Sequence, residues 1–132
     1  CIRYDIPILL HAWYKSIGQL PYETKAQNVA HLAARYPEAR LIMAHLGGNC
    51  QHELKVIAPY RNVSSDFSGS LFRSGDIDCA IRWLGCERVL FGSDMPGASF
   101  LISYGQVEDV ALPEADKARI YRDNARRIIS GV

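Results

Sequence analysis

The stretch RVLFGSD, residues 88–94, is a short apolar run that leads to the carboxylate of Asp94. The same arrangement, an apolar run followed by a histidine or an aspartate, occurs at three other places in the chain. These are residues 6–10 before His11, residues 40–44 before His45 and, as a weaker candidate with one apolar residue, residues 62–65 before Asp66. A short continuous apolar run is typical of a strand buried on both faces, as in a parallel sheet. The four stretches therefore predict four parallel strands, of which residues 88–91 are the strongest candidate and residues 62–65 the weakest.

Segments with the helical spacing of apolar residues lie between these runs and after the last one. We expect helices over residues 23–36, 51–58, 74–85 and 113–129, and a loop with a short helix over residues 97–111. Strands that alternate with amphipathic helices indicate an α/β fold in which helices connect neighbouring parallel strands.

The number of strand–helix units suggests how the sheet is organised. A (β/α)8 barrel typically has about 250 residues, or about 31 for each unit. The chain has 132 residues, which is room for four such units. The pattern leaves two architectures open, a small open α/β sheet and one half of a barrel. No linker or low-complexity stretch divides the chain, so we treat residues 1–132 as one segment.

The composition narrows the class of protein. Hydrophobic residues make up 48% and charged residues 22%, which excludes a disordered tail. The formal net charge of +1 offers no basic surplus for nucleic acid. No apolar run is longer than that of residues 6–10, so we expect no membrane span and no signal peptide. The four cysteines form no CxxC pair, and Cys79 and Cys86, expected on one helix about two turns apart, are too distant for a disulfide. We expect free thiols in a reducing cytoplasm. The chain does not begin with Met, and we expect a piece of a longer protein.

The residues that follow the four strands suggest a site. The carboxyl ends of parallel strands meet at one edge of the sheet, where α/β proteins place their function. The expected residues there are His11, His45, Asp66 and Asp94. Imidazole and carboxylate together suit Zn²⁺, or Mn²⁺ when more oxygen ligands are present. Each residue alone also has a structural interpretation, as a hydrogen-bonded histidine or as an aspartate that caps a helix or holds a turn.

Other polar and aromatic residues are harder to assign. Trp13 follows His11 by two positions, and it either forms the wall of a substrate pocket or packs in the core. His31 and His52 lie in predicted helices, and we expect structural roles for both. Gly47 and Gly48 permit a close backbone approach after His45, but they are not part of a phosphate-binding loop motif.

Five stretches of the chain resemble the metal-dependent amidohydrolase superfamily, in particular its amidohydrolase-related branch of aromatic acid decarboxylases and lactone hydrolases. They are PILLHAW (7–13), YPEARLIMAHLGG (36–48), residues 62–69, RVLFGSDMP (88–96) and NARRI (124–128). The resemblance spans nearly the whole chain in the family's order. It implies that the chain is the C-terminal half of a (β/α)8 TIM barrel, with strands five to eight.

The resemblance also implies roles for the site residues. His11 resembles the family's metal ligand after strand five, and His45 resembles the histidine after strand six that contacts or adjoins the metal and orients substrate or water. Asp94 resembles the aspartate after strand eight, which ligates the metal and acts as a general base. Asp66 has no fixed family role, and we place it with Trp13 among the residues that contact the substrate. The HxH or ExH pair of strand one is absent from these 132 residues.

Three functions remain open at this point. The first is hydrolysis of a C–O or C–N bond in a small molecule by metal-activated water, with Asp94 taking the water proton and His45 orienting or stabilising the developing oxyanion. The second is non-oxidative decarboxylation of a small carboxylic acid at the same site. The third is a non-catalytic half-barrel module. A flavodoxin-like receiver is a weaker idea. We also expect self-association or a missing N-terminal barrel half, because an isolated half would leave two sheet edges unpaired.

Overall fold

The computed structural model describes residues 1–69 and 73–130. Its centre is a four-stranded parallel sheet with the strand order β1-β2-β3-β4. The strands are β1 (Ile8–Leu10), β2 (Leu41–Met43), β3 (Val63–Asp66) and β4 (Val89–Leu90). Each strand pairs with the next one along the chain. Because all the pairs are parallel, every connection returns to the same end of the sheet before the following strand begins.

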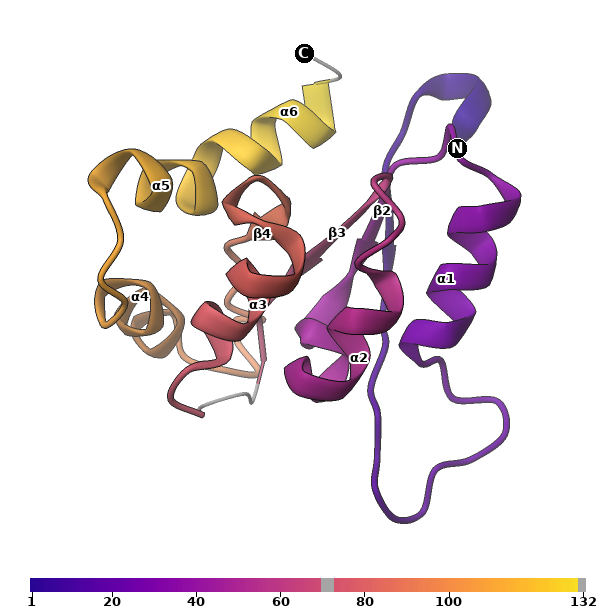
Figure 1. Cartoon of the computed structure of the whole chain (residues 1–132), viewed down its shortest axis with the longest axis horizontal. Coiled ribbons are helices and arrows are strands. Elements are labelled where there is room, and N and C mark those ends of the chain that lie inside the picture. The colour runs from indigo at the N-terminus through magenta and orange to yellow at the C-terminus, as the bar shows by residue number, and fades with distance from the viewer. Residues whose placement is uncertain (70–72, 131–132) are drawn as a thin grey trace.

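Helices connect the strands and follow the last one (Figure 1). They are α1 (Ala26–Arg35), α2 (Cys50–Ile57), α3 (Asp76–Leu84), α4 (Phe100–Glu108), α5 (Glu114–Ala118) and α6 (Asn124–Ser130). A π-helical turn at Arg119–Asp123 joins α5 to α6. The long connection between β1 and α1 extends from the carboxyl ends of the strands, at the bottom of Figure 1.

The two faces of the sheet differ in burial. One face packs against α1, α2 and α3, and its residues Leu41, Met43, Val63 and Val89 are at most 1% exposed. On the other face, Leu9 of β1 is 64% exposed. Its register partner on β2, Ile42, is only half-buried. The crossover helices thus cover one side, as they do in a barrel.

The strand order decides between the two architectures. Open doubly wound sheets reverse their strand order at a switch point and place helices on both faces. Here the order is sequential and the helices cover one face. The four units therefore form the α/β arrangement of a half barrel, and the open-sheet and receiver alternatives are wrong.

The structure corrects three local predictions. The run at 88–91, whose residues made the strongest strand prediction, forms only the two-residue β4, whereas the weaker run at 62–65 forms the longest strand. Residues 100–108 form a full helix rather than a loop with a short one. Cys86 lies beyond α3 in a 3₁₀ turn, not in the same helix as Cys79.

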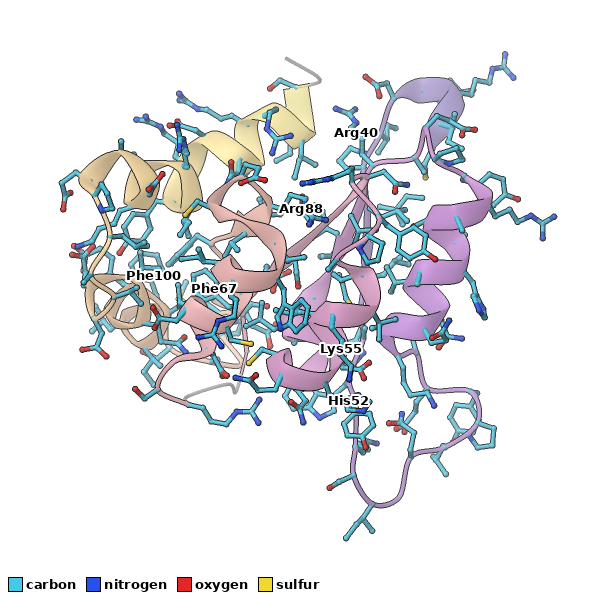
Figure 2. All side chains as sticks on the ribbon, in the orientation of Figure 1. Arg40, His52, Lys55, Phe67, Arg88 and Phe100 are labelled. Carbon is cyan, nitrogen blue, oxygen red and sulfur yellow. The ribbon has the colours of Figure 1, made fainter. Side chains whose placement is uncertain are left out.

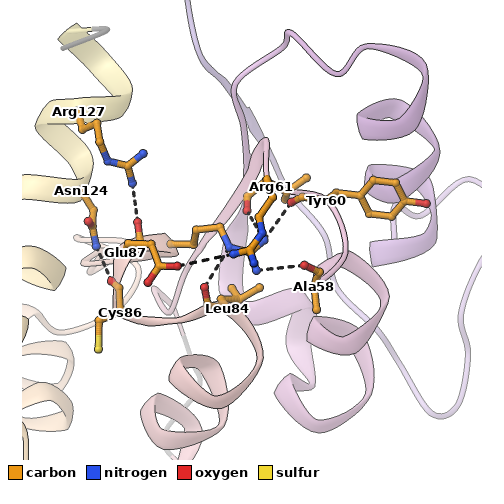
Figure 3. A network of polar contacts seen from close by, with 10 residues as sticks. Ala58, Tyr60, Arg61, Leu84, Cys86, Glu87, Asn124 and Arg127 are labelled. Atoms are coloured by element: carbon orange, nitrogen blue, oxygen red, sulfur yellow. Dashed lines mark hydrogen bonds and ion pairs between the residues drawn. The ribbon is translucent and has the colours of Figure 1, made fainter.

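A buried arginine ties the amino-terminal side of the sheet together (Figure 3). Arg88, which precedes β4, donates hydrogen bonds to the carbonyl oxygens of Ala58, Tyr60 and Leu84 at 2.9–3.1 Å. It also donates to the carbonyl of Val63 at 3.3 Å. Burial lowers the pKa of this guanidinium, and the charge of a neighbouring arginine adds to the effect. One side chain thus satisfies carbonyls at the ends of two helices and in β3.

In the part of the chain that the structure describes, none of the helices combines the length and the apolar character needed to cross a bilayer.

Candidate functional site at the carboxyl ends of the strands

Three of the predicted site residues come together after β1 and β2. The imidazole rings of His11 and His45 lie with their centroids 5.0 Å apart, in an edge-to-face arrangement. The indole of Trp13 meets the His45 ring edge-to-face at 5.6 Å. His11 is exposed, whereas His45 is 9% exposed. The parallel sheet therefore brings the two histidines into contact, as their positions after the strands predicted, although 34 residues separate them in the sequence (45 − 11 = 34).

The ring of His45 is held in one tautomer. Its Nδ1 lies 2.9 Å from the backbone oxygen of Ser68 and 3.1 Å from the Ser68 hydroxyl. A carbonyl oxygen only accepts hydrogen bonds, so Nδ1 carries the proton. In the neutral ring, Nε2 then has a free lone pair. This is how proteins prepare a histidine as a metal ligand or as a proton acceptor.

Asp66 orients this arrangement from β3. Its Oδ1 accepts hydrogen bonds from the backbone N–H of His45 at 3.1 Å, the backbone N–H of Ser68 at 3.0 Å and the Ser68 hydroxyl at 2.5 Å. The carboxylate is buried, so each of these donors depends on it. In the structure Asp66 is a positioning residue, and its contact with substrate remains a prediction.

Unusual backbone conformations gather at the same edge. His45, Leu46 and Asp94 have positive φ angles of 61°, 47° and 58°. Asp5 is the one other non-glycine residue with a positive φ among residues 1–69 and 73–130. Left-handed conformations are costly for residues with a Cβ, and they concentrate at functional sites. Both predicted catalytic residues, His45 and Asp94, are held in this conformation.

Gly69 places His45 near Asp94. A Cβ added at Gly69 would lie 2.8 Å from Nδ1 of His45 and 3.5 Å from Oδ2 of Asp94. Both side chains therefore approach the same backbone position, one from the end of β2 and one from the end of β4. Gly69 also has a φ of 89°, which glycine adopts without strain. The absence of a side chain at Gly69 leaves room for both the imidazole and the carboxylate at this position.

A cavity of about 300 Å³ opens beside His11. It is lined by His11, Trp13, Lys15, Tyr22, Glu23 and Thr24. The ammonium of Lys15 forms an ion pair with Glu23 and, together with the Leu20 backbone N–H, lowers the pKa of that carboxyl group. Trp13 thus forms a wall of a cavity at the site, while its contact with a substrate remains a prediction.

The two glycines after His45 allow the loops of β1 and β2 to pack closely. The backbone N–H of Tyr14 donates to the carbonyl of Gly47 at 2.7 Å. A Cβ at Gly48 would lie 3.0 Å from the Tyr14 nitrogen and 3.1 Å from the Trp13 ring. The predicted close approach is confirmed, and it fixes Trp13 beside His45.

The other two histidines lie away from this cluster. His31 is exposed on α1 and contacts Gln27. His52 stacks on Tyr14 at 4.9 Å, and its Nδ1 lies 2.9 Å from Glu53. Glu53 is buried and accepts a hydrogen bond from the first backbone N–H of α1. These contacts give His52 a structural partner, as predicted.

The donor chemistry can be compared with the needs of a metal. Two imidazoles and a carboxylate are the donor types that Zn²⁺ and Mn²⁺ take. In residues 1–69 and 73–130, however, no group of three or more His, Cys, Asp or Glu side chains is arranged to hold an ion by itself. These side chains have donor atoms of the type that a metal needs, but they are too few, and further ligands are needed to complete the site.

Sequence reasoning missed Ser68 and Gly69, which set the geometry of His45. The motif DFSG, residues 66–69, contained a signal for one of them. An aspartate two positions before a serine frequently accepts the hydrogen bond of that serine's backbone N–H, in an Asx turn. Nothing in the local sequence indicated that the same serine would contact a histidine 23 residues away.

The half-barrel fold, with histidine and aspartate side chains at the carboxyl ends of its strands, defines the structural class. A comparison with models of protein families gives the family. The amidohydrolase family model matches residues 1–130, and the chain belongs to this family. A comparison with curated protein sequences finds no match.

Solved structures share the fold at low sequence identity. A 5-carboxyvanillate decarboxylase from Sphingomonas paucimobilis is 19% identical with a TM-score of 0.73, over 98% of this chain and 50% of that one. A dihydroxybenzoic acid decarboxylase from Polaromonas, solved with manganese and 2-nitroresorcinol, is 20% identical with a TM-score of 0.70, over 96% and 50%. An amidohydrolase from Burkholderia multivorans, solved with zinc, is 22% identical with a TM-score of 0.64, over 80% and 50%. The chain spans about half the length of each.

Proposed function

We propose that this chain supplies the second half of a metal-dependent active site that hydrolyses a C–O or C–N bond in a small molecule. The observation that carries the proposal is the pairing of His11 with His45, whose Nδ1 is committed to Ser68 so that Nε2 is left for chemistry. Family membership and the carboxyl-end position of the cluster support an enzymatic role.

In this proposal a divalent metal, Zn²⁺ before Mn²⁺, is held by His11 and Asp94 with His45 beside them. When bound, such a metal lowers the pKa of a water molecule and polarises a substrate oxygen. The remaining ligands come from residues outside this chain, either from further sequence of the same protein or from a second subunit. The metals bound in the Polaromonas and Burkholderia structures support the choice of ions.

The residues of this chain then move protons and orient the reactants. The Asp94 carboxylate accepts the proton of the attacking water, and its exposed position leaves it accessible to that water. The neutral His45 ring accepts a hydrogen bond at Nε2 and so orients the water. It donates to a developing oxyanion only after it has gained a second proton. Trp13 and the cavity beside His11 hold the substrate, and Asp66 contacts it at the other side.

A second candidate is non-oxidative decarboxylation of a small carboxylic acid. The Sphingomonas and Polaromonas structures that share this fold are decarboxylases. In this reaction Asp94 first takes up a proton from solvent; the bond to the carboxylate then breaks, its electron pair stays on the substrate carbon, and Asp94 delivers the proton to that carbon. Carbon dioxide leaves.

Metal binding tests the shared part of both proposals. We expect zinc titrated into the purified protein to bind more weakly after His11→Ala or Asp94→Asn, whereas His31→Ala on the surface of α1 leaves the affinity unchanged. Equal zinc affinity in the wild type and the three variants would favour the non-catalytic half-barrel module instead.

Activity distinguishes the two reactions. Lactones, amides and aromatic carboxylic acids are offered to the protein together with the rest of its barrel. Hydrolysis of a lactone or amide supports the first proposal, and release of carbon dioxide without hydrolysis overturns it in favour of the second. We further propose a cytoplasmic location, supported by the four free cysteines.

A further inference from the structure

All six residues that line the cavity beside His11 belong to one connection, residues 11–25 between β1 and α1. We call this connection the cavity loop. It closes on itself, because the backbone N–H of Trp13 donates to the carbonyl of Thr24 at 3.0 Å. A loop whose ends meet in this way is compact, but its position depends on what it is attached to. The shape of the cavity therefore depends on how the cavity loop is anchored to the rest of the fold.

The buried carboxylate of Glu53, on α2, anchors the cavity loop near both of its ends. Its Oε2 accepts a hydrogen bond at 2.8 Å from the backbone N–H of Ala26, directly after the loop. Its Oε1 lies 2.9 Å from Nδ1 of His52. The His52 ring stacks on Tyr14, near the start of the loop, with the ring centroids 4.9 Å apart and the planes at 22°. A carboxylate only accepts hydrogen bonds, so Nδ1 of His52 carries the proton. Figure 2 shows His52 beside this connection.

The stem of the Glu53 side chain also packs against the segment that follows His45. A Cβ added at Gly47 would lie 2.6 Å from Cβ and 3.0 Å from Cγ of Glu53, so the glycine lets α2 approach this segment closely. The carbonyl of Gly47 accepts the 2.7 Å hydrogen bond from the backbone N–H of Tyr14. Tyr14 is thus held twice, by its backbone at Gly47 and by its ring on His52. Glu53 contacts the partners of both ends of the loop, although it does not line the cavity itself.

We propose that Glu53 and His52 are positioning residues that hold the cavity loop in the shape that receives the substrate. This inference rests on the proposed function, because the substrate of that reaction is what enters the cavity. Neither residue touches the reacting atoms. A preformed wall reduces the cost of ordering the loop when substrate binds, so the effect falls on binding rather than on the chemical step. An aromatic contact such as that of His52 with Tyr14 contributes about fivefold to the equilibrium between the held and the released loop.

Trypsin cleavage after Lys15, inside the cavity loop, reports release of the loop, because a protease cuts the opened form. His52→Ala removes the stacked ring at an exposed position, and His31→Ala, exposed on α1, is the matched control. We expect initial cleavage after Lys15 to be about fivefold faster in His52→Ala, with an unchanged rate after Arg82 in α3. His52→Phe keeps an aromatic ring and should lie closer to the wild type. Mass spectrometry identifies the two cuts.

Glu53→Gln tests the other part of the anchor. The Ala26 N–H still needs an acceptor, so the amide oxygen faces it and the amide nitrogen donates to Nδ1 of His52. The neutral His52 ring should then carry its proton on Nε2 instead of Nδ1. Imidazole nitrogen NMR signals distinguish the two tautomers. An unchanged tautomer would overturn the role given to Glu53.

Kinetics of the protein together with the rest of its barrel give the functional result. For a lactone or amide that the wild type hydrolyses, His52→Ala should raise KM by up to the same factor and leave kcat within about twofold. A KM equal to that of His31→Ala overturns the inference. An unchanged cleavage rate after Lys15, or equal acceleration after Lys15 and Arg82, also overturns it. A wild type that hydrolyses no substrate contradicts the proposed function instead, and the cleavage rates still decide whether His52 holds the loop.

Discussion

The backbone N–H of His45 donates a 3.1 Å hydrogen bond to Oδ1 of Asp66. This bond joins the end of β2 to the end of β3, and the same oxygen also accepts two hydrogen bonds from Ser68. Ser68 in turn holds the His45 ring through its carbonyl oxygen. The orientation of one candidate catalytic histidine thus depends on a carboxylate that does not touch its ring.

Replacing this carboxylate should unfold the protein more easily. Asp66→Ala leaves three donors without their acceptor in a buried environment, and we expect a loss of about 3 kcal/mol in the free energy of unfolding. Urea denaturation measures it. Asp109→Ala removes an exposed carboxylate at the end of α4 and should change little. Similar effects of the two substitutions would contradict the role given to Asp66.

Gly69 offers a test of how the His45 ring is held in place. Gly69→Ala forces a Cβ to within 2.8 Å of His45 Nδ1, while Gly75→Ala adds one at a similar φ of 84° with nothing within 4 Å. In both variants the left-handed backbone lowers the free energy of unfolding by about 1 kcal/mol. Only Gly69→Ala should also displace the His45 ring, visible as a shift of its imidazole NMR signals. Unchanged signals in that variant would show that the ring has other support.

The Arg88 network predicts a stability effect at the other end of the sheet. Arg88→Met keeps much of the side-chain volume but leaves the carbonyls of Ala58, Tyr60 and Leu84 without this donor. We expect a loss of about 3 kcal/mol in the free energy of unfolding. Arg82→Met, on the exposed side of α3, is the control. If thermal and urea unfolding place the two variants at the same stability, the network contributes no more than surface charge does.

The contact between α4 and α5 predicts a pH dependence. Hydrogen bonds from Lys117 and Tyr121 lower the pKa of Glu108, so the folded state favours its charged form. This contribution to stability is complete above the pKa of a glutamate in the unfolded chain, about 4.3, and is lost as the pH falls through the lower folded value. Glu108→Gln should reduce the loss of stability on acidification below that pH. Glu38→Gln, on an exposed connection, should retain the wild-type pH profile in acid unfolding experiments.

Sequence reasoning found the general position of the site because strand ends are a topological property. Apolar runs that end in His11 and His45 are visible in the sequence, and a parallel sheet then brings their ends together whatever the spacing between them. Asp94 was placed at the same edge by the same argument. The family resemblance, rather than the pattern, supplied the proposed role of each residue.

The finer geometry depends on contacts that no local pattern encodes. The positive φ angles of His45 and Asp94, and the hydrogen bond from His45 to Ser68, arise only when β2, β3 and β4 are assembled. The prediction that residues 88–91 form the strongest strand and residues 62–65 the weakest was wrong for a related reason. Apolar content favoured residues 88–91, but Ser64 and Ser65 fit a strand because the Ser65 hydroxyl donates to the carbonyl of Met43. Tertiary pairing, not propensity, decided the length of β3.

The Arg88 network and the His45 cluster occupy opposite ends of the same short strands. A protein engineer can therefore vary an exposed residue at the carboxyl end, such as His11, without disturbing Arg88 and its carbonyl partners. The converse also holds. Inherited changes around Arg88 would lower the amount of folded protein in the cell and leave the His45 cluster of each remaining folded molecule intact.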